Sequence, residues 1–149
     1  CQIICDIYSR YLFETSVFEL RGGEFLSADR LCELMLEAQK KAYGDGLDHS
    51  VLHPYMWLCK SHYYSGSLSF YNFPYAFGGL FARGLYAKYR AEGEAFVPKY
   101  KAMLHATTVM DAEDAAAIAG IDLTDHAFWE SSLASIAKDI DEFLRLTEK

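Results

Sequence analysis

Residues 69–90 read SFYNFPYAFGGLFARGLYAKYR, and this stretch decides the fold class. Apolar side chains recur there at steps of three and four residues, as they do on one face of an α-helix. These side chains are Phe70, Phe73, Phe77, Leu80, Phe81, Leu85 and Tyr89. Pro74 interrupts the pattern, so the sequence predicts either that the first helical turn begins there or that the helix is kinked. Gly78, Gly79 and Gly84 each weaken the helix by about 1 kcal/mol relative to Ala, which indicates that something packs or binds closely against it.

The same spacing predicts helices over most of the remaining chain. We expect helices over residues 3–20 with a stop at Gly22 and Gly23, from Ser27 as N-cap to near residues 44–46, over residues 94–106, over residues 111–119 with Asp111 as cap, and from Thr124 or Asp125 as cap through Leu144. Residues 47–69 have a looser pattern and are predicted to be rich in loops. Strand signals and internal repeats are weak. The sequence therefore predicts an all-α fold of about five to six helices, with no significant sheet, in a single helical unit spanning residues 1–149.

Composition narrows the classes of function. The chain has 149 residues, of which 52% are hydrophobic and 23% charged, as in a globular protein. A formal net charge of -7 without a compensating Lys/Arg stripe argues against nucleic acid and acidic membranes as partners. No run approaches the roughly 20 apolar residues of a membrane span, and no signal segment is evident. The four cysteines lack CxxC spacing, which favours reduced, buried thiols and a cytoplasmic location.

Residues 62–79 form the candidate site. They concentrate phenols, one imidazole and four Gly or Pro residues where a helical core would use aliphatic side chains. His62 is followed by Tyr71 and Tyr75, which lie one helical turn apart and so share a face if both are helical. Phenol and imidazole groups can bind a peptide backbone or stabilise an oxyanion. A binding site is favoured over the alternative that each ring is a half-buried packing residue.

The histidines and carboxylates give no metal motif. No H-E-x-x-H occurs, and His49 and His53, although four residues apart, are followed by Pro54, which makes a shared helical face doubtful. No G-x-S-x-G is present to carry a serine nucleophile. The sequence thus predicts no metal site within this chain. It also opens with Cys1 inside a helical pattern, without a capping residue, which predicts a piece of a longer protein.

Several of these segments resemble a known family. Residues 52–57 (LHPYMW), 62–64 (HYY) and 70–78 (FYNFPYAFG) resemble the C-terminal part of oligoendopeptidase F and its relatives, the thimet-oligopeptidase-like zinc metallopeptidases. Residues 6–14 (DIYSRYLFE) resemble the helix that these enzymes carry beyond their zinc site. Residues 120–123 (GIDL), with Phe128 and Trp129, resemble the terminal helices of the same family. The resemblance covers nearly the whole chain.

The resemblance implies a zinc-dependent metalloendopeptidase that hydrolyses short peptides. In that family H-E-x-x-H and a later Glu hold the zinc, and both would lie upstream of this chain, which would be the C-terminal portion of the catalytic domain. By position, His62 matches the substrate-binding histidine, Tyr71 the phenol that stabilises the transition state, and Tyr75 the neighbouring phenol on the same face. Tyr64 is expected to line the substrate site. Phe73 departs from the family, where a Tyr is frequent.

The implied partners are short peptides and the remainder of the parent chain. Zinc would be bound by the intact parent and not by this chain, which alone would be inactive. Two alternatives stay open: a non-catalytic helical domain that binds peptides without a metal, and a plain helical interaction domain whose tyrosines belong to its core. Residues upstream of Cys1 would discriminate the first alternative, and whether the Tyr71 and Tyr75 hydroxyls face a cleft would discriminate the second.

Overall fold

The computed structural model describes residues 2–148, and all regular secondary structure among them is helical, which confirms the all-α prediction. Contacts divide the chain into two compact units, Cys1–Phe77 and Gly78–Lys149, where the sequence predicted a single helical unit over residues 1–149. Cys1, predicted to begin in a helical pattern, lies outside the described residues.

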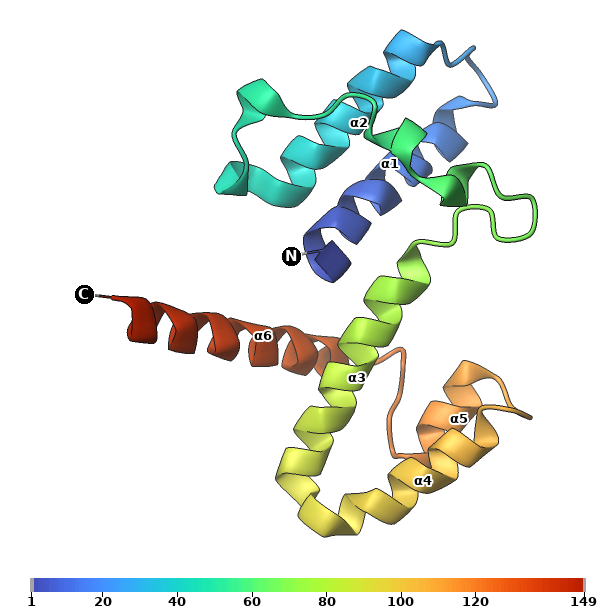
Figure 1. Ribbon diagram of the computed structural model, residues 1–149. Helices are drawn as coiled ribbons and strands as arrows, with labels where there is room; N and C mark the ends of the chain where they lie inside the picture. Colours follow the sequence, from blue (N-terminus) through green and yellow to red (C-terminus); the bar gives the residue numbers. More distant parts are fainter. Residues whose placement is uncertain (1, 149) are drawn as a thin grey trace. The chain divides into compact units, whose positions relative to one another are not determined.

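The first unit is built on two helices that lie side by side, α1 (Ile7–Leu20) and α2 (Ala28–Tyr43) (Figure 1). A π-helical segment, Gln2–Asp6, precedes α1. Ser27 caps α2 as predicted, because its side-chain oxygen accepts a hydrogen bond from the backbone N–H of Arg30 at 3.2 Å. Phe13 of α1 packs with the buried side chains of α2, and these form the core of the unit: Leu34, Met35 and Ala38.

Short 3₁₀ segments follow α2, as the loose pattern of residues 47–69 predicted. They are Gly44–Gly46, His49–Val51, η4 (Met56–Cys59) and η5 (Ser61–Tyr63). Gln39 anchors this part to α2, since its side-chain amide donates to the carbonyl of His53 at 2.9 Å. Trp57 and Tyr63 then pack against the core of the first unit, which brings η5 close to α1.

The long helix α3 covers Phe73–Glu92, so the prediction that it begins at residue 69 is wrong. Phe70 has a φ of 58°, a left-handed conformation that cannot continue into a helix. The carbonyl of Asn72 accepts the hydrogen bond from the N–H of Tyr75 at 3.1 Å, which opens the first turn. Pro74 lies in that turn, where its missing N–H costs no hydrogen bond, so the first of the two predicted alternatives for Pro74 is confirmed.

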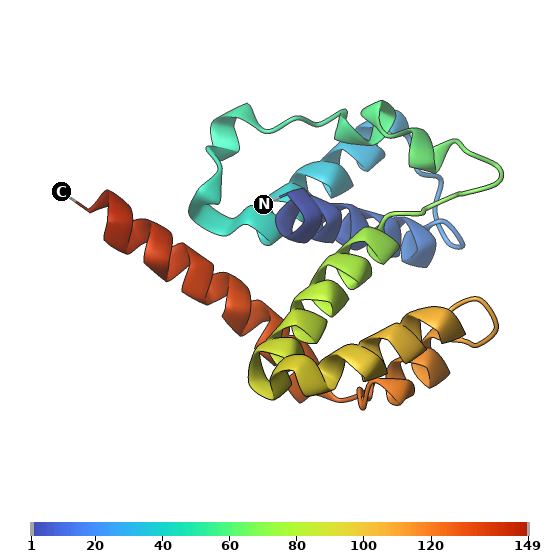
Figure 2. The same ribbon diagram turned by 60° about the horizontal axis from the view of Figure 1, so that its bottom comes forward.

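The second unit contains the rest of α3, a 3₁₀ segment η6 (Gly93–Phe96), α4 (Val97–Ala106), α5 (Ala112–Ile118) and α6 (His126–Thr147). Helices α4 and α5 lie side by side (Figure 2). Asp125 caps α6 by accepting the N–H of Ala127 at 2.9 Å. Asp111 precedes α5 in extended backbone, but its side chain makes no cap hydrogen bond. The core of this unit gathers buried side chains from α3 to the α5–α6 connection: Leu85, Phe96, Met103, Ala106, Ala115, Ala116, Ala119 and Ile121.

None of the helices between residues 2 and 148 is long and apolar enough to cross a membrane.

Candidate functional site

Three of the predicted site residues meet in the first unit. His62 belongs to η5, Tyr75 lies in the first turn of α3, and Tyr71 lies in the turn just before it. The Tyr75 hydroxyl oxygen lies 3.5 Å from His62 Nε2, and the two rings meet edge-on with centroids 5.9 Å apart. Tyr71 meets Tyr75 edge-on at 5.7 Å. We call these three residues, His62, Tyr71 and Tyr75, the donor row.

The donor row is accessible to a ligand. Tyr71 is 41% exposed and Tyr75 is 46% exposed, so neither phenol is a core residue. This result argues against the interpretation of these tyrosines as ordinary core packing. Tyr71 lies in the turn before α3, so the expectation that it shares a helical face with Tyr75 is wrong, although the two rings are in contact.

Tyr64 is arranged differently from the donor row. Its ring is 59% exposed, and its hydroxyl donates to the backbone carbonyl of Trp57 at 3.4 Å. The predicted substrate contact of Tyr64 therefore stays a prediction, without a link to His62 among the described hydrogen bonds.

Phe70 closes the loop that connects His62 to the start of α3. Its N–H donates to the carbonyl of His62 at 2.9 Å, and its ring contacts Phe18 and Tyr63 at centroid distances of 4.7 and 5.6 Å. A left-handed backbone at a residue other than glycine costs about 1–3 kcal/mol and persists only where the surroundings enforce it. Such strain clusters at functional sites, and here it sets the distance between η5 and α3.

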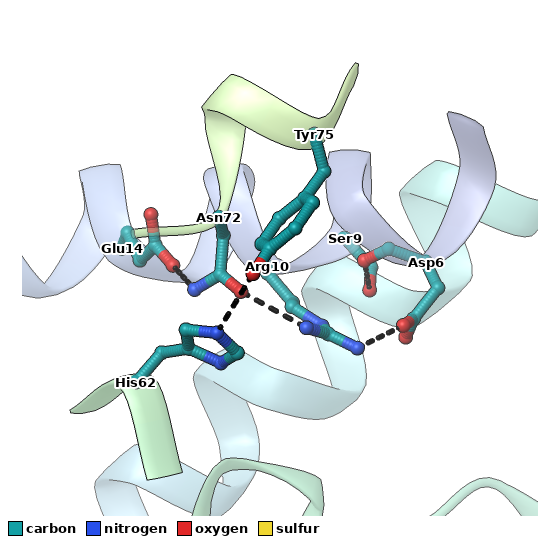
Figure 3. A network of polar contacts seen from close by, with 7 residues as sticks. All are labelled: Asp6, Ser9, Arg10, Glu14, His62, Asn72 and Tyr75. Carbon is teal, nitrogen blue, oxygen red and sulfur yellow. Dashed lines mark hydrogen bonds and ion pairs between the residues drawn. The ribbon is translucent and has the colours of Figure 1, made fainter. Parts of the chain in front are cut away.

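Figure 3 draws His62 and Tyr75 of the donor row together with a polar network of Asp6, Arg10, Glu14 and Asn72. Asn72, 0% exposed, stands between two side chains of α1: its Oδ1 accepts from Arg10 Nη1 at 2.9 Å, and its Nδ2 donates to Glu14 Oε1 at 2.5 Å. Arg10 also forms an ion pair with Asp6 one turn earlier. Because arginine can only donate, it sets the orientation of the Asn72 amide. Removing one partner of a buried charged network typically costs about 3–5 kcal/mol.

The pKa values of two groups in or beside this network, Glu14 and Tyr63, are raised. Burial raises the pKa of Glu14, and the hydrogen bond from Asn72, the nearby Tyr63 hydroxyl and the positive charge of Arg10 only partly oppose this rise. Burial, followed by the nearby Glu14 carboxylate, holds the pKa of the Tyr63 hydroxyl well above its usual range. The Tyr63 oxygen is buried without a hydrogen bond of good geometry among the described residues. Glu14 and Tyr63 are thus the groups of this network whose protonation depends on folding.

One ring nitrogen of His62 contacts Tyr75, and the other has no hydrogen-bond partner among the described residues. Nε2 faces the Tyr75 hydroxyl, whereas Nδ1 is buried and has no hydrogen-bond partner within residues 2–148. Trp57 Nε1 is a second buried nitrogen of this unit in the same state. Unsatisfied buried polar atoms are costly and are typical of sites that receive a ligand or ordered water.

Sequence reasoning did not identify the network as part of the site, although one signal was present. Asp6, Arg10 and Glu14 follow each other at steps of four residues, so they share one helical face, on which Arg10 and Glu14 are buried. Buried charged groups must be paired. Asn72 gave no local signal, because its partner Glu14 is 58 residues away along the chain.

A large cavity lies elsewhere, in the second unit. It has a volume of about 620 Å³ and is lined by aromatic and aliphatic side chains of α3, η6 and α4, the aromatic ones being Tyr86, Tyr89, Phe96 and Tyr100. None of the predicted site residues lines it. The donor row is therefore an open surface site, separate from this cavity.

Residues 2–148 contain no group of three or more His, Cys, Asp or Glu side chains that could hold a metal ion. The donor set at the candidate site, two phenols and an imidazole, does not fit a zinc site. The exposed phenols of the donor row can donate hydrogen bonds to an oxygen atom of a ligand. No family model matches the chain, and neither does any curated protein or solved structure.

Proposed function

We propose that this chain forms the substrate-binding wall of a zinc metalloendopeptidase that hydrolyses short peptides. The observation that carries the proposal is the donor row: Tyr71 and Tyr75 lie on one segment and His62 on another, their rings are in contact from Tyr71 through Tyr75 to His62, and both phenols are exposed. The resemblance of residues 62–64 and 70–78 to oligoendopeptidase F supplies the reaction class.

The chemistry follows from the donors. A peptide carbonyl oxygen accepts hydrogen bonds weakly in the ground state and strongly once it becomes an oxyanion in the tetrahedral intermediate. In the proposed complex the Tyr71 hydroxyl donates to this oxygen, His62 holds the bound peptide, and Tyr75 supports both from between them. One such donor is typically worth about 3–4 kcal/mol in the transition state.

The buried network supports this role because it makes the wall rigid. Donors stabilise a transition state best when they need not reorganise during the reaction. The segment that carries Tyr71 and Tyr75 is tied to α1 through the fully buried side chain of Asn72, and to η5 through the Phe70–His62 backbone hydrogen bond. The segment that carries the two phenols is therefore held by contacts with both α1 and η5.

The proposal assigns zinc to the remainder of the parent chain, because the donor set described above does not fit the metal. The bound metal would supply Lewis-acid activation in the intact enzyme. Short peptides and the rest of the parent are the proposed partners, with neither nucleic acid nor a membrane among them. Cys5, Cys32 and Cys59 are free thiols, which supports a reducing, cytoplasmic compartment; Cys5 and Cys32 are only partly buried and Cys59 is exposed, so the prediction of buried thiols is wrong.

A peptide assay on the full-length parent tests the proposal. We expect turnover of short quenched-fluorescent peptides that a chelator abolishes and that added zinc restores. The matched control is the parent with its H-E-x-x-H glutamate replaced by glutamine. Binding of the same peptides without turnover in any condition would contradict the peptidase and favour a non-catalytic peptide-binding domain.

A further inference from the structure

Asn72 differs from its neighbours in the site. Its side chain is 0% exposed, whereas Tyr71 on one side is 41% exposed and Phe73 on the other is 61% exposed. A fully buried amide between two exposed aromatic residues points away from any ligand. Asn72 can therefore affect a bound ligand only through the residues that it holds in position.

Both the backbone and the side chain of Asn72 are engaged. The N–H donates to the Phe70 carbonyl at 2.9 Å, and the carbonyl accepts from Tyr75 N–H at 3.1 Å. The side chain binds Arg10 with its oxygen and Glu14 with its nitrogen. Asn72 thus connects the left-handed Phe70, the first turn of α3 and helix α1.

We propose that Asn72 is the positioning residue of the donor row: anchored on α1 by Arg10 and Glu14, it sets Tyr71 and Tyr75 against His62. The reaction that the donor row would serve rests on the proposed function. The positioning of Tyr71 and Tyr75 by Asn72 depends only on the contacts described above. The Tyr75–His62 contact of 3.5 Å is already at the limit of a hydrogen bond, so a small slip of the α3 start breaks it. Misplacing catalytic groups by about 1 Å can cost about 100-fold in rate.

The chemistry of the two partners explains why an amide is needed. Arg10 offers only donors and the Glu14 carboxylate offers only acceptors, so the bridging group must accept on one side and donate on the other. Asn72→Asp keeps the acceptor for Arg10 but sets a second carboxylate against Glu14. The double variant Glu14→Gln/Asn72→Asp reverses donor and acceptor between positions 14 and 72 and keeps the net charge of the network.

The test compares four forms of the full-length parent: the native protein, Asn72→Asp, Glu14→Gln, and the double variant. The contact is read from nuclear Overhauser effects between the labelled rings of His62 and Tyr75, and function from kcat and KM on a short peptide. We expect Asn72→Asp to lose the ring contact and at least about tenfold in kcat, with KM changed by less than about threefold. The double variant is expected to regain both. Glu14→Gln is expected to keep both, since the amide oxygen introduced at position 14 still accepts from Asn72.

A folded Asn72→Asp protein that keeps the ring contact and kcat overturns the inference. So does a double variant that fails to fold or stays as impaired as the single variant. If Asn72→Asp alone does not fold, recovery of fold, ring contact and kcat in the double variant supports the anchor. If no form cleaves peptides, the proposed function fails, while the ring contact in the four forms still decides the positioning role.

Discussion

The Tyr75 hydroxyl oxygen lies 3.5 Å from His62 Nε2, although thirteen residues separate the two along the chain. The contact exists because the loop between them is closed at Phe70, whose N–H donates to the His62 carbonyl. Closing this loop with a left-handed residue is unfavourable in isolation, so packing of Phe70 on Phe18 and Tyr63 must compensate. The donor row is therefore a product of the core of the first unit.

Replacing Glu14 by Gln should stabilise the protein increasingly as the pH rises. Burial raises the pKa of Glu14, so the folded chain holds this proton more tightly than the unfolded chain does. As pH rises from the ordinary value of 4.5 through the raised folded pKa, the unfolded state loses this proton first, and the contribution of Glu14 to wild-type stability falls. The groups that face Glu14 are the Asn72 amide, the Tyr63 hydroxyl and Arg10, which itself pairs with Asp6.

Urea unfolding from about pH 4 to about pH 8 measures this effect. The difference in unfolding free energy between Glu14→Gln and wild type should grow over the window and level off above the folded pKa. Glu19→Gln, an exposed change on the same helix, is the matched control. A difference for Glu14→Gln that does not vary with pH would show that this carboxyl titrates as an exposed group.

Gly84→Ala should destabilise the second unit. A methyl group at Gly84 would lie 2.3 Å from Phe128 Cζ and 2.8 Å from Ser132 Oγ, so α6 would have to shift. Overpacking of this kind typically costs about 1–3 kcal/mol. Gly78→Ala on the same helix is the control, because nothing lies within 4 Å of its new methyl group. That variant should gain about 0.5–1 kcal/mol from helix propensity. Thermal unfolding compares them, and equal shifts for both would refute the close packing at Gly84.

The 149-residue chain alone should neither bind zinc tightly nor hydrolyse peptides. Its described residues offer no group that fits a metal, and positioned donors without an activated nucleophile supply only part of the reduction in barrier. Metal analysis after dialysis and a quenched-fluorescent peptide assay measure the two properties. Stoichiometric zinc or chelator-sensitive turnover in the isolated chain would contradict the proposed division between this wall and the rest of the parent.

The variants of the donor row in the full-length parent should separate binding from catalysis. His62→Ala is expected to raise KM as well as lower kcat, because His62 is proposed to hold the peptide. Tyr75→Phe should be intermediate, since its hydroxyl contacts His62 and its ring supports Tyr71. Steady-state kinetics with zinc content checked measures both. An unchanged KM in His62→Ala would remove His62 from peptide binding.

Local features of the fold could be predicted from the sequence, because each depends on neighbouring residues. Ser27 and Asp125 cap their helices through backbone N–H groups two or three residues away. The start of α3 was predicted only as one of two alternatives at Pro74, because Asn72 is held by Arg10, 62 residues away, and apolar periodicity carries the expected helix through Phe70. The helical pattern of the sequence continues from one unit into the next and so did not predict the division into two units.

The candidate site was predicted in part. Phenol density and Gly/Pro breaks pointed to residues 62–79, and the structure brings His62, Tyr71 and Tyr75 together. Their meeting depends on a turn, whereas the prediction assumed a shared helical face. The polar network depends on contacts between segments about 60 residues apart, which no local spacing reveals.

The effect of Tyr71→Phe on kcat in the full-length parent tests the central claim most directly. The change removes one hydroxyl from an exposed ring and leaves the contact with Tyr75 in place. If the hydroxyl donates to the developing oxyanion, kcat should fall about 100- to 1000-fold while KM stays within about threefold. A kcat within about twofold of the native value, less than about 0.5 kcal/mol, would show that the phenol is structural and that the assignment of the donor row is wrong.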